Sequence, residues 1–252
     1  MIRAIMNGCA GHMGRVLFSL AESDNDITFA AGIDPAPCTG APCPVFASPA
    51  ECDADADVVI DFSSFRAVDA LLDFCREKKL PLVLCTTGLT DEQIAKVQEY
   101  SAEFPILRSA NMSLGINILQ KLIADAAKVL APAGFDMEIV EKHHNLKCDA
   151  PSGTALALAE SLNQAMDGEY HYTYDRTSRH EKRDPKEIGI SAVRGGSIVG
   201  EHEIIFAGTD EVVTLKHTAF SKAIFGKGAI AAAKFLAGKK SGLYDMSDVI
   251  GG

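Results

Sequence analysis

Short apolar runs alternate with helical patterns along the first 110 residues. Strands are predicted at 2–7, 27–33, 58–62, 80–85 and 106–108, and helices at 16–21, 67–78 and 91–104. This alternation predicts a parallel sheet with right-handed crossovers. The strand runs are continuously apolar, which is typical of strands covered on both faces. Residues 35–57 are irregular and are predicted to cross one edge of the sheet.

The pattern changes after Asn111. A long apolar helix is predicted over 114–130, and strands follow at 136–141, 188–193, 201–206 and 212–217, with one helix after residues 152–154. Residues 167–187 are predicted to form an exposed loop, and the last helix, 224–236, to return to the first domain. The fold expected is α/β: a Rossmann-like domain of residues 1–112 and 218–252, and an α+β domain of residues 113–217 with a mixed or antiparallel sheet.

Composition narrows the class of protein. Of 252 residues, 47% are hydrophobic and 23% charged, which is ordinary for a soluble globular chain. The net charge of −10 disfavours nucleic acid as a partner, because an acidic surface repels phosphate backbones. No apolar stretch is long enough to span a membrane. The seven cysteines are scattered without a Cys-x-x-Cys pair, and the N-terminus lacks an export signal, so we expect reduced cysteines and a cytoplasmic location.

A glycine-rich turn follows the first predicted strand. It contains Gly8, Cys9, Ala10, Gly11, His12 and Met13, and Gly14 completes a Gly-x-x-Gly-x-x-Gly spacing. Glycines permit a tight turn, and the helix behind it presents N–H groups to a pyrophosphate. Asp34 ends the second strand, where a carboxylate can accept hydrogen bonds from ribose hydroxyls. A purely structural turn is the alternative, and position and Asp34 together favour a dinucleotide.

Two further loops fall at predicted carboxyl ends of strands, where open α/β sheets bind ligands. One contains Cys85, Thr86 and Thr87, and the other Ala110, Asn111, Met112 and Ser113. Their hydroxyl, amide and backbone groups could line a nicotinamide pocket. Taken alone, either loop is equally well explained as an ordinary turn.

The densest polar cluster is EKHHNLKCDAPSGTA, residues 141–155. His143 and His144 exchange protons near neutral pH, and Lys147 adds a cation. Ser152, Gly153 and Thr154 begin a helix whose N–H groups can bind an anion. The cluster thus predicts a small-anion site with an acid beside it, although each residue alone also suits a cap, a strand or a solvated surface. Adjacent strand residues point to opposite faces, so both histidines can face one ligand only if the strand has ended.

Other candidates are weaker. His171 and His180 lie in the predicted loop, and His202 and His217 lie in strand patterns that favour packing or surface positions. No set of residues converges as metal ligands would, so no metal is expected. The absence of Gly-x-Ser-x-Gly leaves a serine hydrolase without support.

The cluster strongly resembles the signature of the dihydrodipicolinate reductase family. The resemblance extends over nearly the whole chain, through GCAGHMGR, AGIDP, Asp61-Phe62-Ser63, CTTG, ANMSLGIN, RGGSIVGEH and GLYDM. It implies an enzyme of lysine and diaminopimelate biosynthesis, typically a homotetramer, that reduces 4-hydroxy-tetrahydrodipicolinate with NADH or NADPH and releases water. It also implies a small cyclic dicarboxylate substrate.

The resemblance assigns roles to residues of this chain. His143 is similar to the family's proton donor and Lys147 to its second acid and carboxylate partner. His144, Ser152, Gly153 and Thr154 correspond to substrate-binding positions. The cofactor contacts implied are the glycine turn from Gly8 to Met13, Asp34, Cys85 to Thr87 and Ala110 to Ser113.

The chain departs from the commoner family pattern near the cofactor. Cys85 stands where glycine usually precedes Thr-Thr, His12 replaces a frequent Arg or Lys, and Pro35 follows the ribose-binding acid. These changes, with Asp34, favour NADH over NADPH and leave the choice open. Two alternatives compete: an NAD(P)-dependent amino-acid dehydrogenase, disfavoured by residues 149–154, and a dinucleotide sensor without chemistry, disfavoured by intact His143 and Lys147.

Overall fold

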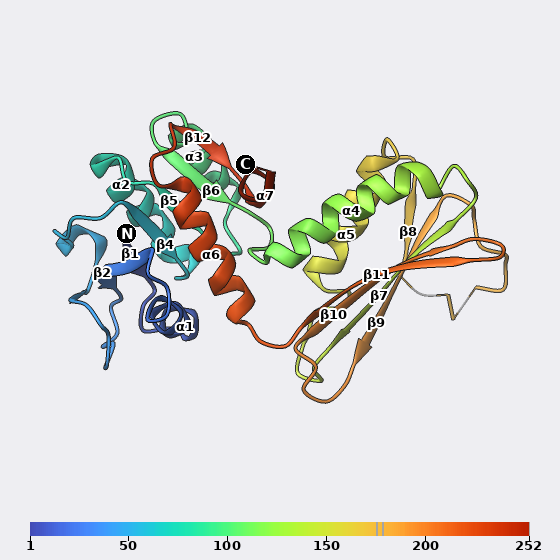
Figure 1. The fold of residues 1–252 in the computed structure, drawn as a ribbon, viewed down its shortest axis with the longest axis horizontal. Coiled ribbons are helices and arrows are strands. Elements are labelled where there is room, and N and C mark those ends of the chain that lie inside the picture. The colour runs from blue at the N-terminus through green and yellow to red at the C-terminus, as the bar shows by residue number, and fades with distance from the viewer. Residues whose placement is uncertain (175, 178, 252) are drawn as a thin grey trace. The chain divides into compact units, whose positions relative to one another are not determined.

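The computed structural model describes residues 1–174, 176–177 and 179–251. The chain forms two compact units, one of residues 1–114 and 223–252 and one of residues 115–222 (Figure 1). The second unit extends beyond the predicted boundary at 217 because its last strand, β11 (Val212–Ala219), runs through that position. The α/β fold, with a Rossmann-like parallel sheet and a second mixed sheet, is as predicted.

The first unit is built on a seven-stranded sheet in the order β12-β6-β5-β4-β1-β2-β3. All its strand pairings are parallel. Its strands are β1 (Ile2–Asn7), β2 (Ile27–Ile33), β3 (Val45–Phe46), β4 (Val58–Asp61), β5 (Leu82–Leu84), β6 (Pro105–Arg108) and β12 (Gly242–Tyr244). Its helices are α1 (His12–Ala21), α2 (Val68–Lys78), α3 (Asp91–Tyr100), α6 (Ala223–Leu236) and α7 (Met246–Gly251), with short 3₁₀ turns at Pro49–Glu51 and Phe65–Ala67.

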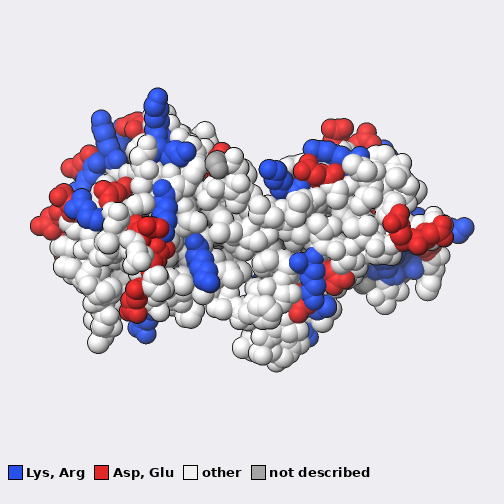
Figure 2. Space-filling view, in the orientation of Figure 1, with Lys and Arg blue, Asp and Glu red and all other residues white. Residues whose placement is uncertain are grey.

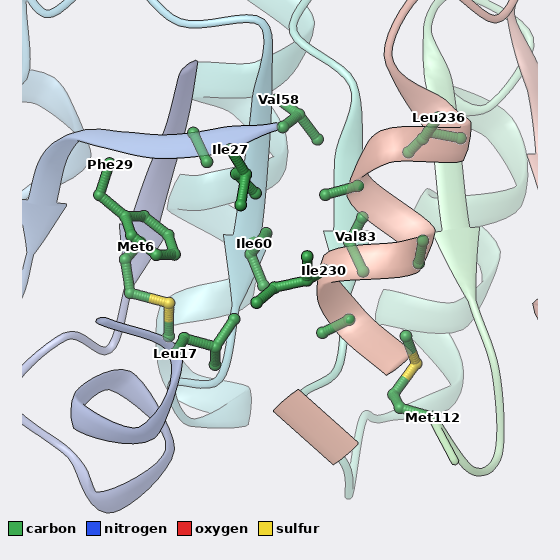
Figure 3. Packing of buried hydrophobic residues seen from close by; sticks show 14 of the residues in the cluster. Met6, Leu17, Ile27, Phe29, Val58, Ile60, Val83, Met112, Ile230 and Leu236 are labelled. Carbon is green, nitrogen blue, oxygen red and sulfur yellow. The ribbon is translucent and has the colours of Figure 1, made fainter. Parts of the chain in front are cut away.

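Both faces of this sheet are buried. Alternate residues of one strand enter different cores: Met6 packs with α1 and α6, whereas Ile5 packs with α2 and α3. The continuous apolar runs follow from this double burial. Figure 3 shows Met6, Leu17 and Ile230 in the first core, with Ile230 contributed by α6. Helix α6 therefore packs within the first unit.

The second unit has a five-stranded sheet in the order β11-β10-β7-β9-β8. Strand β7 (Asp136–His143) pairs antiparallel with β10 (Gly200–Ala207) and parallel with β9 (Glu187–Arg194), and β8 (His171–Thr173) is parallel to β9. The sheet is thus mixed. Helices α4 (Leu114–Leu130) and α5 (Gly153–Ala165) supply Ile123 and Leu158 to its core.

Several predicted elements differ from the structure in their limits; the helix predicted over 16–21, for example, begins at His12. The helix expected over 91–104 ends at Tyr100 with Ser101 as its C-cap, because Pro105 has no N–H for the carbonyl of Ser101 and its ring would clash with that carbonyl in a continued helix. The segment 167–187 is not wholly an exposed loop, since it contains β8 and two buried polar residues, Thr173 and Glu187. Its arginines anchor it: Arg183 binds acidic side chains of β7, and Arg176 pairs with Glu187.

Surface charge is mixed. On the face drawn in Figure 2, basic and acidic side chains are interspersed over both units. Among the residues that the structure describes, none of the helices combines the length and the apolar character that crossing a bilayer requires.

Candidate active site and dinucleotide-binding turn

The glycine turn between β1 and α1 is held tightly against its neighbours. Gly8 has a φ of +84°, and a Cβ there would lie 2.6 Å from the carbonyl oxygen of Phe62. A Cβ on Gly14 would lie 2.5 Å from the carbonyl oxygen of Cys9. Both positions therefore require glycine, for backbone conformation at the first and for close approach at both.

The turn leads directly into the first turn of α1. Gly11 is the N-cap, and no side chain in the described part of the chain caps the helix. A cavity of about 430 Å³ lies at this turn, lined in part by Gly8, Gly11, Asp34 and Ser63. Main-chain N–H groups at a helix start suit a phosphate, and the carboxylate of Asp34 suits ribose hydroxyls. The residues present thus fit a dinucleotide.

Some predicted contacts face the core instead of the cavity. Cys9 is fully buried and Met112 is 4% exposed, and both side chains belong to the core shared by α1 and α6. Only main-chain groups at these two positions are available to a cofactor. His12 is exposed at the start of α1, and Met13 packs partly against the same core.

The two predicted loops do follow strands, Cys85 after β5 and Ala110 after β6. Beside them, Asp61 ends β4 with no exposed surface and accepts hydrogen bonds from Asn7 Nδ2 at 2.7 Å and Ser63 Oγ at 2.6 Å. Burial raises the pKa of Asp61 in spite of these bonds. Burial also raises the pKa of the Cys85 thiol, and the nearby Asp61 raises it further. From the sequence, Asp61 was identified only as part of a motif shared with the family, and neither Asp61 nor Asn7 was assigned to this site.

In the second unit, the His-His segment begins where β7 ends. His143 is the last residue of the strand, and His144 follows it. The constraint that adjacent strand residues face opposite sides therefore no longer applies to His144. The turn is closed by hydrogen bonds from Gly195 N to His143 O and from Lys147 N to His144 O. Lys147 Nζ lies 2.8 Å from Asp149 Oδ1, and this contact lowers the pKa of Asp149.

A buried carboxylate organises this end of the sheet. Glu141 has no exposed surface, and its Oε2 lies 2.6 Å from Nδ1 of His143. Arg194, at the end of β9, donates to both oxygens at 2.7 and 2.8 Å. Ser152 N–H donates to Oε1 at 3.0 Å. The strand alternation that buries Glu141 also buries His143, because residues two apart share a face.

The start of α5 is tied to the same cluster. Ser152 is the N-cap, and its Oγ accepts a hydrogen bond from Ala155 N at 3.1 Å. The same oxygen lies 3.0 Å from His202 Nε2. The His202 ring packs edge-on against His143, with centroids 5.2 Å apart. Gly153 is exposed, and a Cβ there would meet no other described atom within 4 Å, so this helix start is accessible.

The structure thus gathers His143, His144, Lys147 and residues 152–154 at one end of the second sheet. Two members of the cluster were missed from the sequence. Arg194 lies 53 residues from Glu141, so no local sequence pattern predicts that the two side chains pair. His202 was predicted to be a packing or surface residue. The register between β10 and β7, which places His202 beside β7, could not be known from the sequence.

The parallel sheet, glycine turn and acid at the end of β2 define the class: a Rossmann-type dinucleotide-binding protein with a second domain built on a mixed sheet. Residues 2–112 match the family described as dihydrodipicolinate reductase, N-terminus, and residues 115–250 match its C-terminus. The chain belongs to the dihydrodipicolinate reductase family, whose members bind NAD(P)H through this fold.

Individual relatives agree with this assignment. The 4-hydroxy-tetrahydrodipicolinate reductase of Caldanaerobacter subterraneus subsp. tengcongensis is 51% identical over 250 residues, covering 99% of this chain and 98% of that protein. That of Clostridium novyi is 45% identical over the same coverage. A dipicolinate-bound dihydrodipicolinate reductase from Paenisporosarcina sp. TG-14 has the same fold, with a TM-score of 0.82, 23% identity and 97% coverage of both chains.

Proposed function

We propose that this chain reduces 4-hydroxy-tetrahydrodipicolinate to tetrahydrodipicolinate with NADH or NADPH, in lysine and diaminopimelate biosynthesis. Family membership supports the reaction, because the relatives that match over the full chain carry this reductase name. The observation that carries the proposal is the convergence of His143, Lys147 and the start of α5 at one end of β7. A ring dicarboxylate needs cationic and N–H partners for two charges, and this end of the sheet offers both.

The reacting ring is the conjugated C=C–C=N system formed when the hydroxyl group leaves as water. When bound, a reduced nicotinamide would supply the hydride for this system. The added electron pair moves towards the ring nitrogen, and a proton must then be delivered to the reduced ring. We assign that proton to His143, and we assign binding of the substrate carboxylates to Lys147, His144, Ser152, Gly153 and Thr154. The ion pair of Lys147 with Asp149 holds the ammonium group at the loop.

For the cofactor, we propose contacts from the glycine turn, Asp34, the Cys85–Thr87 loop and the Ala110–Ser113 loop. The carboxylate of Asp34 lines the cavity at the turn, and a 2′-phosphate there would meet its negative charge. We therefore infer a preference for NADH over NADPH. At Cys9 and Met112 the proposed contacts are made by the backbone, because their side chains are buried.

We also propose a homotetramer assembled through the second unit. Among its described residues, helices cover one face of the sheet only, and the strands alternate between buried and partly exposed residues, as β7 and β10 do. An apolar residue such as Val193 is 44% exposed in the single chain. Light scattering after size-exclusion chromatography would show four chains per particle, and a monomer would contradict this assembly.

A coupled assay tests the reaction. Dihydrodipicolinate synthase supplies the substrate, and NADH and NADPH oxidation are followed separately by absorbance. We expect oxidation that depends on the synthase product, and no oxidation of either cofactor would reject the function. His143→Gln and Lys147→Ala should each lower turnover by about 10²-fold or more while NADH binding is unchanged. Near-normal turnover in both variants would reject the residue assignment.

A further inference from the structure

Glu141 is an unusual residue to find fully buried beside a proton donor. Carboxylates are rarely buried without partners, because desolvation disfavours the charged form. Here both oxygens are fully engaged: Oε1 accepts from Ser152 N and Arg194 Nη2, and Oε2 accepts from Arg194 Nη1 and contacts His143 Nδ1. The site therefore provides for an ionised carboxylate.

The pKa of Glu141 supports the ionised state. Burial acts to raise its pKa, but the hydrogen bonds from Arg194, His143 and Ser152 N more than offset it, so the pKa lies below its ordinary value. An ionised carboxylate can only accept hydrogen bonds. Its contact with His143 Nδ1, at 2.6 Å, therefore requires the proton to be on Nδ1.

We propose that Glu141 is a positioning residue that fixes the tautomer of His143, so that Nε2 is the ring atom that donates the proton. This inference rests on the proposed role of His143 as the acid. When the imidazolium gives up its Nε2 proton, the neutral ring keeps Nδ1–H on Glu141 and does not turn. Arg194 neutralises the formal charge of Glu141, so the carboxylate orients the ring without taking its proton.

The residues around His143 support proton donation from Nε2. A Cβ built on Gly200 would lie 3.1 Å from Nε2, so the missing side chain of Gly200 leaves space beside the donating atom. The edge-on His202 ring packs against the His143 ring, and Ser152 binds both His202 and Glu141. The ring is therefore held at Nδ1 and on one side, with Nε2 next to a glycine.

The tautomer can be measured without substrate or cofactor. The full chain, labelled with ¹⁵N, is studied by two-bond ¹H–¹⁵N correlation spectra at a pH where His143 is neutral, with its signals assigned by their loss in His143→Gln. We expect the neutral ring of the unmodified protein to be protonated on Nδ1. Protonation on Nε2 would overturn the proposal, and this result does not depend on any variant of Glu141 folding.

Glu141→Gln then tests the cause. A glutamine amide can donate to a bare Nδ1, so the Nε2–H form should become populated and kcat should fall about tenfold or more, with the KM for NADH unchanged. The matched control is Glu138→Gln, which removes another arginine-paired carboxylate of β7, bound to Arg183 on the alternate face. It should leave the His143 signals as they are.

The two proposals fail in different ways. If the unmodified protein shows no turnover in the coupled assay, the function is rejected while the tautomer measurement stands. If it turns over and Glu141→Gln keeps the Nδ1–H form with kcat within twofold, the positioning role is rejected and the function is kept.

Discussion

The main-chain N–H of Ala10 donates a hydrogen bond of 3.0 Å to Oδ2 of Asp34, and so joins the glycine turn to the end of β2. The other oxygen of Asp34 accepts from Ala36 N at 2.9 Å. The carboxylate is thereby fixed at the edge of the 430 Å³ cavity. Its place is set by the backbone on both sides, which makes its charge a fixed feature of the proposed ribose site.

Asp34→Asn should change cofactor discrimination. Replacing the carboxylate by an amide removes the repulsion of a 2′-phosphate and weakens the acceptor for ribose hydroxyls. The ratio of kcat/KM for NADPH to that for NADH should rise about tenfold, equivalent to about 1.4 kcal/mol. Asp53→Asn, an exposed substitution outside the cavity, serves as the control. An unchanged ratio would show that Asp34 does not discriminate between the 2′-hydroxyl and the 2′-phosphate of the ribose.

Gly200→Ala should impair proton delivery. The new methyl group would lie 3.1 Å from His143 Nε2, where a substrate atom would have to approach. We expect kcat to fall about tenfold or more, since small displacements at a reacting centre cost large factors in rate. Gly195→Ala is the control, because a Cβ there meets no described atom within 4 Å and its N–H is kept. Equal rates for the two variants would argue against a reacting Nε2.

His202 should make the folded state sensitive to acid. Burial, with a smaller contribution from His143, lowers the pKa of His202 to about 4. The unfolded chain takes up this proton near pH 6.5, so the contribution to stability is present above 6.5 and is lost as the pH falls towards 4. Urea unfolding between pH 7 and 4 should show a loss of about 2–3 kcal/mol in the unmodified protein that His202→Gln lacks.

The control for that comparison is His180→Gln, because His180 is exposed in the second unit. Its pH dependence should follow that of the unmodified protein. If the free energies of unfolding of His202→Gln and of the unmodified protein changed in parallel with pH, His202 would take up its proton equally readily in the folded and unfolded states.

The cysteines should differ sharply in reactivity. Cys148 is exposed beside Lys147, whereas Cys9 is buried and its pKa is raised to about 12 by burial and by the neighbouring Cys38. Burial likewise raises the pKa of Cys43 to about 11. At pH 8 iodoacetamide should modify Cys148 first and Cys9 only after unfolding, as peptide mass spectrometry would show. Early labelling of Cys9 would contradict its place in the core.

Periodicity predicted the long elements well because each buries a regular face. The helix over 114–130 and the strand pattern at 2–7 match α4 and β1 in both limits. The short strands β8 and β12 were missed, since three residues are too few to establish a period. What places β12 is its parallel pairing with β6, a contact between residues far apart in the sequence.

The candidate site was predictable as far as its residues are neighbours in the chain. His143, Lys147 and Ser152 lie within ten residues, and such a dense group of polar side chains can be recognised in the sequence as a candidate site. Glu141 was visible too, but its role was not, because its partner Arg194 comes from β9. Buried polar contacts between strands depend on sheet register, which a single sequence does not specify.

The four donors that meet at Glu141 come from β7 itself, from the end of β9 and from the start of α5. Only the His143 donor belongs to the same strand as Glu141, so the donors of Arg194 and Ser152 reach the carboxylate when β9 and the start of α5 have packed against β7. The acid of the proposed reaction is therefore a product of cooperative folding, and not a preformed loop. During gradual denaturation, catalytic competence and the second sheet should disappear together, at one midpoint.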